Sequence, residues 1–157
     1  MTNTPSPPAL TWFASVDVDV DQPITIGSTT DGVRRVVPIR GGRAHGDGWV
    51  GTVLDAGADF QQYSSPGLAH LVASYVVEVE GGPRLLIENR ALRHGDPEAL
   101  ERLMKGETVS RDEIYFRCFP RVTAPEDSDL AWVNSRLFVG TGTRLPDSVR
   151  LDFFTVE

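Results

Sequence analysis

The sequence predicts an all-β protein: a closed antiparallel β-barrel with one short helix. Seven to nine short runs of branched and aromatic residues recur between turn signals, and only one stretch carries a full set of helix signals. Closure removes the exposed edges that an open sheet would leave, so a barrel is favoured over a sandwich. A chain of 157 residues, 40% of them hydrophobic, suits one domain. We place it at residues 11–157, after a Pro- and Thr-rich N-terminal tail (residues 1–10) that we expect to be disordered.

The strands are expected where apolar and polar residues alternate or where branched and aromatic residues gather. Alternation in the first run puts Trp12 and Val16 on one face and Phe13 and Asp17 on the other. Asp31 and Gly32 form a turn signal that predicts a hairpin. The expected strands cover residues 11–20, 33–39, 49–54, 71–79, 85–92, 113–119, 132–139 and 149–156.

One helix is predicted after the central hairpin. Asp96 is a suitable N-cap, Pro97 stands at the first helical position, and Gly106 ends the segment. Leu100 and Leu103 share one side, which suits a helix that packs on a sheet as a lid or plug.

Composition excludes several classes of function. The 22 acidic residues outnumber the 15 basic ones, and the net charge of -7 opposes binding to nucleic acid or to anionic membranes. The N-terminal residues lack a signal-peptide pattern, so we expect a cytoplasmic protein. One cysteine and three histidines far apart in sequence predict neither a disulfide nor a metal site, and we expect no cofactor.

Polar and aromatic residues stand out in two of the expected strands. Tyr115 and Arg117 share one face of the strand at 113–119. Trp132 and Asn134 share one face of the strand expected at 132–139. Such a face on otherwise apolar strands indicates a binding site, and barrel closure would bring it opposite residues near position 60.

The order of motifs resembles domain-of-unknown-function family 3237, nearly end to end. The residues that carry the resemblance are IRGGRAHGDGWVGTVLDAGADFQ at 39–61, SYVVEVEGGPRLLIENR at 74–90, YFRCFPRV at 115–122 and AWVNSRLFVGTG at 131–142. The resemblance implies a lipocalin-like barrel and, for members near biosynthetic or degradative genes, small-molecule chemistry of the kind found in secondary metabolism.

A cofactor-free site follows as a hypothesis. We expect Asp59 to remove or shuttle a proton beside a carbonyl, while Arg117 and Asn134 stabilise the charge that develops on oxygen. An adjacent Arg117 would keep Asp59 ionised. The reaction would be that of an isomerase, cyclase or lyase acting on a carbonyl-containing metabolite. The residues expected to bind the substrate are Gln61, Tyr75, Asn89, Tyr115 and Trp132.

Other interpretations stay open. Asp59 and Asn134 also suit structural roles, as a turn or ion-pair residue and as a partner of backbone groups. The barrel as a whole also fits a carrier of a small apolar or aromatic ligand, or a filled barrel that acts as a homodimer subunit. Arg117, Trp132 and Asn134 should face the same cavity as Asp59 if the enzyme hypothesis is right in this form.

Overall fold

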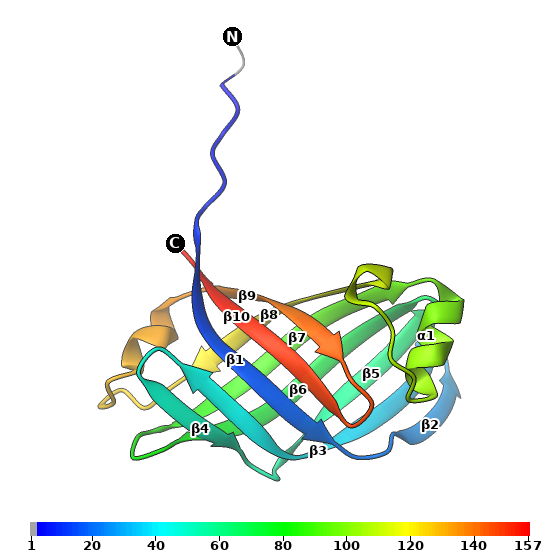
Figure 1. Ribbon diagram of the computed structural model, residues 1–157, viewed down its shortest axis with the longest axis horizontal. Coiled ribbons are helices and arrows are strands. Elements are labelled where there is room, and N and C mark those ends of the chain that lie inside the picture. Colours follow the sequence, from blue (N-terminus) through cyan, green and yellow to red (C-terminus); the bar gives the residue numbers. More distant parts are fainter. Residues whose placement is uncertain (1–2) are drawn as a thin grey trace.

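The computed structural model describes residues 3–157, which form ten strands, one α-helix and two short 3-10 helices (Figure 1). The strands are β1 (Leu10–Val20), β2 (Ile24–Thr29), β3 (Gly32–Gly46), β4 (Trp49–Val53), β5 (Gly57–Ser65), β6 (Leu68–Val79), β7 (Arg84–Gly95), β8 (Ile114–Thr123), β9 (Phe138–Arg144) and β10 (Ser148–Val156). The helices are α1 (Pro97–Met104), η1 (Arg111–Glu113) and η2 (Ala131–Ser135).

The sheet closes on itself, which confirms the predicted antiparallel barrel. The strands run in the order β1-β10-β9-β8-β7-β6, and β4 and β5 connect β6 to β3. β3 pairs with β1, which closes the barrel. β4 and β5 fill successive stretches of the gap between β3 and β6, and β2 extends one edge of β3. Residues 3–9 extend away from the barrel without regular secondary structure (Figure 1), whereas Met1 and Thr2 of the expected tail lie outside the described residues.

A β-bulge in β1 changes the predicted alternation. The register with β10 shifts between Trp12 and Ala14, because two residues of β1 there oppose one of β10. Phe13 is therefore buried, while Trp12 is 40% exposed. The prediction for these two residues was wrong because it assumed a strict period of two.

Helix α1 forms as predicted and lies across one end of the barrel (Figure 1). The carboxylate of Asp96 accepts a hydrogen bond from the backbone N–H of Glu98, and Gly106 follows the helix with a φ of +81°. Leu100 and Leu103 pack with Val109 in a small apolar cluster of their own. The helix thus covers the rim of the barrel without entering the main core.

The strand expected at residues 132–139 begins only at Phe138. Residues 131–135 instead form η2, in which the N–H of Val133 bonds to the carbonyl of Leu130 at 3.1 Å. A short apolar run does not distinguish strand from helix by its pattern. Local hydrogen bonds decide for the helix here, which closes the end of the barrel opposite α1 (Figure 1).

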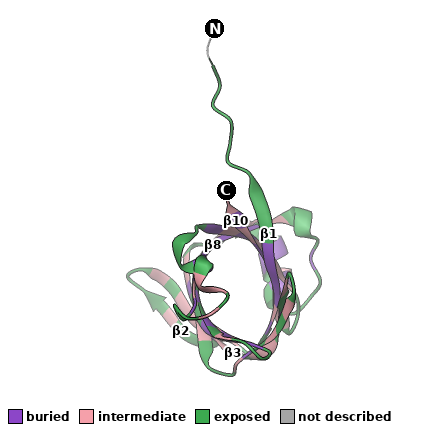
Figure 2. Cartoon of the chain, turned by 90° about the vertical axis from the view of Figure 1, so that its left-hand side faces the viewer, coloured by how far each residue is buried: buried purple, intermediate pink, exposed green. Residues whose placement is uncertain are grey.

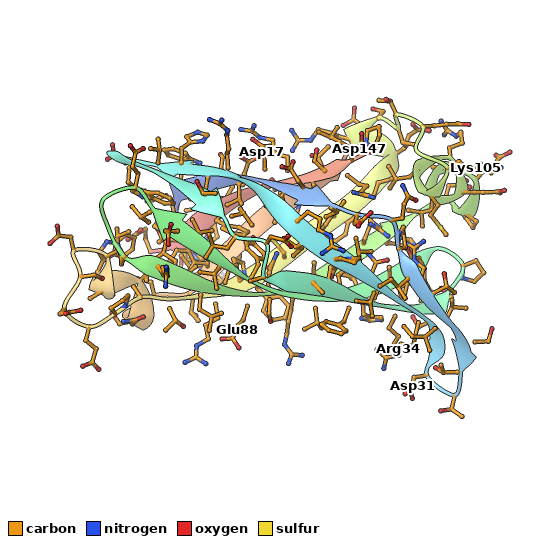
Figure 3. The ribbon with its side chains drawn as sticks, turned by 90° about the horizontal axis from the view of Figure 1, so that it is seen from below. Asp17, Asp31, Arg34, Glu88, Lys105 and Asp147 are labelled. Carbon is orange, nitrogen blue, oxygen red and sulfur yellow. The ribbon has the colours of Figure 1, made fainter. Side chains whose placement is uncertain are left out.

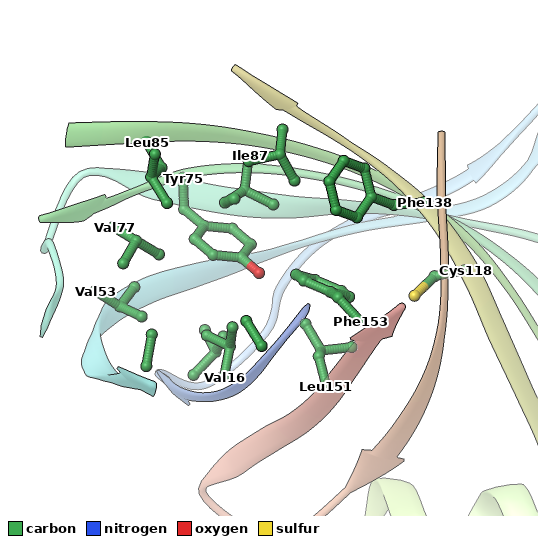
Figure 4. Close-up of a cluster of buried hydrophobic side chains, with 14 of the residues drawn as sticks. Val16, Val53, Tyr75, Val77, Leu85, Ile87, Cys118, Phe138, Leu151 and Phe153 are labelled. Carbon is green, nitrogen blue, oxygen red and sulfur yellow. The ribbon is translucent and has the colours of Figure 1, made fainter. Parts of the chain in front are cut away.

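The interior is packed in its η2 half. Figure 2 looks along the barrel from this end, and Figure 4 shows the buried side chains that fill it. Phe13 lies at the end of this core. The centre of its ring is 5.5 Å from that of the Trp132 ring and 5.1 Å from that of the Phe138 ring. The other fully enclosed members include Val16, Val53, Val77, Leu85, Ile87 and Phe153.

Charged side chains project outward from the strands (Figure 3). Asp17 pairs with Arg150 at 3.4 Å and Glu78 with Arg84 at 2.7 Å, both on exposed or half-exposed surface. Among residues 3–157, no helix is both long and apolar enough to cross a membrane.

Candidate functional site

A small cavity of about 50 Å³ lies inside the barrel, next to the packed half and toward α1. Its wall combines apolar side chains with a compact polar set. The polar members are Asp59, Gln61, Tyr75, Asn89, Arg93 and Arg144. The lining strands include β5, β6, β7 and β9, so barrel closure is what assembles the site.

Four of the eight predicted site residues meet in this cavity. Asp59 and Gln61 come from β5, Tyr75 from β6 and Asn89 from β7. Period-two geometry puts Asp59 and Gln61 on the same face of β5, and closure turns that face inward.

Arg117 and Tyr115 do not reach the cavity, and the prediction that they share it with Asp59 was wrong. Both are exposed on the outer face of β8, where the Arg117 guanidinium lies 5.2 Å from the centre of the Tyr115 ring. Phe116 and Cys118 point inward instead. The physical reason is the pairing with β7, which sets Arg117 opposite the exposed Leu92 and Cys118 opposite the buried Ala91.

Trp132 and Asn134 also lie away from the cavity, because both belong to η2 rather than to a strand. The Asn134 side chain accepts a hydrogen bond from the N–H of Ala124 at 2.8 Å and donates one to the carbonyl of Ala124 at 2.9 Å. Trp132 is 43% exposed and packs edge-on against Phe13. These contacts agree with the alternative in which Asn134 serves as a hydrogen-bond partner of backbone groups.

Asp59 has one oxygen held and one free. Its Oδ2 accepts a hydrogen bond from Nε2 of Gln61 at 2.8 Å, whereas its enclosed Oδ1 has no hydrogen-bond partner. The residue as a whole is half-buried, yet the carboxyl oxygen itself is sealed from solvent. Burial raises the pKa of Asp59, and this outweighs the hydrogen bond from Gln61 and the charges of Arg93, Arg144 and Arg35, which lower it. Arg117 takes no part, contrary to the prediction.

A hydrogen-bond network orients Gln61. Its Oε1 accepts from Nη2 of Arg35 at 2.8 Å, which leaves the amide nitrogen to face Asp59. The hydroxyl of Tyr63 accepts from Nη2 of Arg93 at 2.7 Å and from Nη2 of Arg35 at 3.2 Å. Arg35 thereby fixes Gln61 directly, and Arg93 acts through the Tyr63 hydroxyl, which donates to the same Oε1 at 3.4 Å.

Tyr75 and Asn89 are buried and hold unpartnered polar atoms at the cavity. The Tyr75 residue is 1% exposed, and its hydroxyl, which points into the interior in Figure 4, has no hydrogen-bond partner among the described residues. Burial raises the pKa of Tyr75, and the nearby Cys118 and Asp59 raise it further, so the hydroxyl stays protonated. The carbonyl oxygen of Asn89 is likewise enclosed and unpartnered.

Sequence reasoning missed Arg35, Tyr63, Arg93 and Arg144. The signal was present for two of them: counting by twos from Asn89 reaches Arg93, and counting from Asp59 through Gln61 reaches Tyr63. Arg93 is only 4% exposed, and its Nε has no hydrogen-bond partner in the described chain. An arginine is seldom buried without an acidic partner, so sequence reasoning did not single out Arg93.

The site's remaining chemistry is simple. Burial raises the pKa of the Cys118 thiol to about 11, so it behaves as a small neutral side chain, as predicted. Within residues 3–157 there is no group of three or more His, Cys, Asp or Glu side chains that could hold a metal ion. A larger depression of about 1040 Å³ lies on the outer surface between β3, β4 and the β6–β7 turn, but its lining includes none of the enclosed, unpartnered polar atoms.

Comparison with known proteins places this barrel in a family. The family described as protein of unknown function (DUF3237) matches residues 8–156, which is nearly the whole chain. The chain belongs to the DUF3237 family. The chain is also 39% identical over 130 residues to the UPF0311 protein RPA1785 of Rhodopseudomonas palustris, covering 83% of this chain and 84% of that protein.

Solved structures share the fold of this DUF3237 protein. The crystal structure of RPA1785, a conserved protein of unknown function, superposes with a TM-score of 0.91 at 34% identity and covers 98% of this chain and 100% of its own. The crystal structure of an enzyme from Penicillium herquei has a TM-score of 0.72 at 14% identity, with all of both chains covered. At 14% identity, the similarity to the Penicillium herquei structure supports the barrel fold alone.

Proposed function

We propose that this DUF3237 protein is a cofactor-free enzyme that transfers a proton on a small carbonyl compound held inside the barrel, as an isomerase, cyclase or lyase does. The observation that carries the proposal is the Asp59 carboxyl group. Its Oδ1 is enclosed and unpartnered at the cavity, and burial raises its pKa. A carboxyl group with a raised pKa can accept a proton at one step and return it at the next near neutral pH.

Tyr75 takes the role that we had assigned to Arg117 and Asn134. A proton removed beside a carbonyl leaves an electron pair that moves onto the carbonyl oxygen. The protonated, unpartnered hydroxyl of Tyr75 is a donor for that oxygen. Asp59 and Tyr75 line the same cavity, and the charge of Asp59 contributes to the raised pKa of Tyr75.

Hydrogen exchange tests the proposal without knowledge of the natural substrate. Enolisable carbonyl compounds, including acetoacetate and acetylacetone, are incubated with the protein in deuterium oxide, and proton NMR follows deuterium incorporation beside the carbonyl above the uncatalysed rate. Asp59→Asn should slow this exchange by about a hundred- to ten-thousandfold. Asp55→Asn is the matched control, because Asp55 is exposed and pairs with Arg40 outside the cavity. Exchange at the wild-type rate in Asp59→Asn would refute the proposal.

A ligand carrier is the second candidate function. The apolar part of the cavity wall favours it, since Val37, Ile39, Leu71 and Leu151 could hold a small apolar group without any reaction. A carrier would bind compounds of the panel and return them unchanged, with no deuterium incorporated after long incubation. Incorporation that depends on Asp59 would reject this alternative.

The cytoplasmic location and the homodimer remain predictions that accompany the proposal. Cell fractionation checks the first and analytical ultracentrifugation of the purified protein checks the second.

A further inference from the structure

Three arginines stand between the cavity and the outside. A second hollow, of about 170 Å³, lies beyond the cavity between α1, the β1–β2 connection and the β9–β10 turn. Arg93 and Arg144 line both spaces and Arg35 lines the outer one, whereas Asp59 and Tyr75 line only the inner one. The order from the mouth inward is therefore arginines first, then Asp59 and Tyr75, then the packed core.

These arginines lack acidic partners. Within residues 3–157, no carboxylate lies within 4.0 Å of the guanidinium group of Arg35, Arg93 or Arg144. Nη2 of Arg93 donates a hydrogen bond to the Tyr63 hydroxyl, and Nη1 of Arg144 donates one to the carbonyl of Ser148 at 3.2 Å. Of the described residues, Asp59 is the acidic group that lines the inner cavity with Arg93 and Arg144, and the outer hollow adds Asp21 and Asp147. Asp21 pairs with Arg40, so three positive charges face Asp59 inside and Asp147 at the rim.

The acidic groups at the rim do not cancel this excess. Asp21 accepts a hydrogen bond from Arg40 at 3.1 Å, and Lys105 pairs with Glu101 at 3.0 Å on exposed surface. Asp147 lies at the same rim. Burial of uncompensated cations is costly, and the charges of Arg93 and Arg35 add to burial in lowering the pKa of Arg144. An anion between these guanidinium groups would relieve that cost, in a protein whose net charge is otherwise -7.

We infer that Arg35, Arg93 and Arg144 bind the carboxylate of the ligand, and that the substrate class is a small carboxylate anion that also carries a carbonyl group. The enclosed, unpartnered Nε of Arg93 supplies one donor for it, and guanidinium groups recognise carboxylates through paired hydrogen bonds. With its carboxylate at the arginines, the molecule would extend inward so that its carbonyl reaches Tyr75. The carbonyl half of this inference rests on the proposed function.

The chemical step balances without another reactant. The carboxylate of Asp59 takes the proton from the carbon beside the carbonyl, and the C–H electron pair becomes the C=C bond of an enolate. The π pair of the carbonyl moves onto the oxygen, which accepts the hydrogen bond of Tyr75. The proton on Asp59 then returns to the same carbon or to a conjugated one, which regenerates the carboxylate. Return to a conjugated carbon is isomerisation, and hydrogen exchange results when the proton on Asp59 is replaced by one from solvent before the return.

Calorimetric titration tests the carboxylate site. Acetoacetate and the uncharged acetylacetone are titrated into wild type, Arg144→Met and the control Arg121→Gln, together with acetate, propionate and their neutral amides. Arg121 is an outward-facing arginine of β8. Wild type should bind the carboxylates and not the matched neutral compounds. Arg144→Met should weaken acetoacetate about 30-fold or more, while Arg121→Gln binds as wild type does.

Thermal unfolding of each variant confirms that it is folded, and Arg93→Met serves as a second variant. Equal binding of anions and neutral partners, equal loss in Arg144→Met and Arg121→Gln, or no carboxylate binding across the panel would each overturn the inference.

The experiments can refute the carboxylate site and the proton transfer independently of each other. If Asp59→Asn and wild type bind acetoacetate but neither exchanges its hydrogens, the carboxylate site stands and proton transfer falls. If Arg144→Met still exchanges acetoacetate and acetylacetone at the wild-type rate, proton transfer stands and the carboxylate site falls.

Discussion

The amide nitrogen of Gln61 donates a hydrogen bond of 2.8 Å to Oδ2 of Asp59, while the enclosed Oδ1 of the same carboxyl group has no hydrogen-bond partner among the described residues. The amide oxygen of Gln61 is held by Arg35, so the donor cannot turn away without breaking that contact. The pKa of Asp59 therefore depends on the arginines at the mouth, because Arg35 holds the Gln61 side chain that lowers it.

Gln61→Leu should raise the pKa of Asp59 further, because the hydrogen bond that lowers this pKa is lost. It should also reduce the free energy of unfolding by about 1–3 kcal/mol, since Arg35 loses its acceptor. Carbon-13 NMR of the Asp59 carboxyl group against pH and urea unfolding measure the two effects. Gln62→Leu is the control, as Gln62 bonds only at exposed surface. A lower or unchanged pH midpoint for the Asp59 titration in Gln61→Leu would contradict the prediction.

Stability should depend on pH through Asp59 in a direction opposite to that of most carboxylates. Its folded-state pKa is raised above 3.8, so the folded protein keeps this proton where the unfolded chain has lost it. The free energy of unfolding of wild type, relative to Asp59→Asn, should fall as pH rises from near 3.8 to the folded-state pKa, and then level off. Urea unfolding of both proteins from about pH 4 to about pH 8 measures this difference. A difference that grows in favour of wild type with pH has the wrong sign.

Tyr75→Phe should stabilise the ligand-free protein and impair its chemistry. Its hydroxyl is buried without a partner, so removal should raise the free energy of unfolding by about 1 kcal/mol. Hydrogen exchange on the carbonyl compound should slow by about 100-fold, because a donor to the developing charge is lost. Tyr115→Phe, on the exposed face of β8, should change neither quantity. A Tyr75→Phe protein that is less stable would show that the hydroxyl has a partner.

Arg117→Ala should leave carboxylate binding and hydrogen exchange unchanged. Arg117 is exposed, and its contacts are the Tyr115 ring and the carbonyl of Phe116. The free energy of unfolding should stay within about 0.5 kcal/mol of wild type. Calorimetry and the exchange measurement check this result, and a large loss of either activity would restore the role first predicted for Arg117.

Asn134→Ala should reduce stability rather than reactivity. The side chain holds both backbone groups of Ala124, and losing these two hydrogen bonds should cost about 1–3 kcal/mol in urea unfolding. Ser135→Ala is the neighbouring control in η2, where the hydroxyl donates to the carbonyl of Trp132 at 3.2 Å. Slower exchange at unchanged stability would instead indicate a chemical role for Asn134.

The barrel could be predicted because period-two patterns and turn residues are local signals. Gly32, at the predicted turn, has a φ of +102°, which a glycine adopts readily. Four of the proposed site residues, Asp59, Gln61, Tyr75 and Asn89, do line the cavity. The local pattern failed at β8, because both faces of that strand have aromatic residues and the choice depends on its neighbour.

Strand pairing decides that choice, and pairing is a long-range property. Arg117 lies opposite the exposed Leu92, whereas Cys118 lies opposite the buried Ala91. The bulge at Trp12 and Ala14 was likewise invisible to a rule of strict alternation. The arginine cluster was missed for a third reason: its members come from β3, β7 and β9, and only closure brings them to one mouth.

The aromatic plug of Phe13, Trp132 and Phe138 turns the barrel into a cup rather than a tunnel. Whatever occupies the inner cavity must leave through the opening by which it arrived, past the same arginines. Departure of one molecule therefore has to precede arrival of the next. A tightly held anion at the rim would block entry as well as exit. Under the proposed function, a product that keeps its carboxylate would therefore act as a competitive inhibitor.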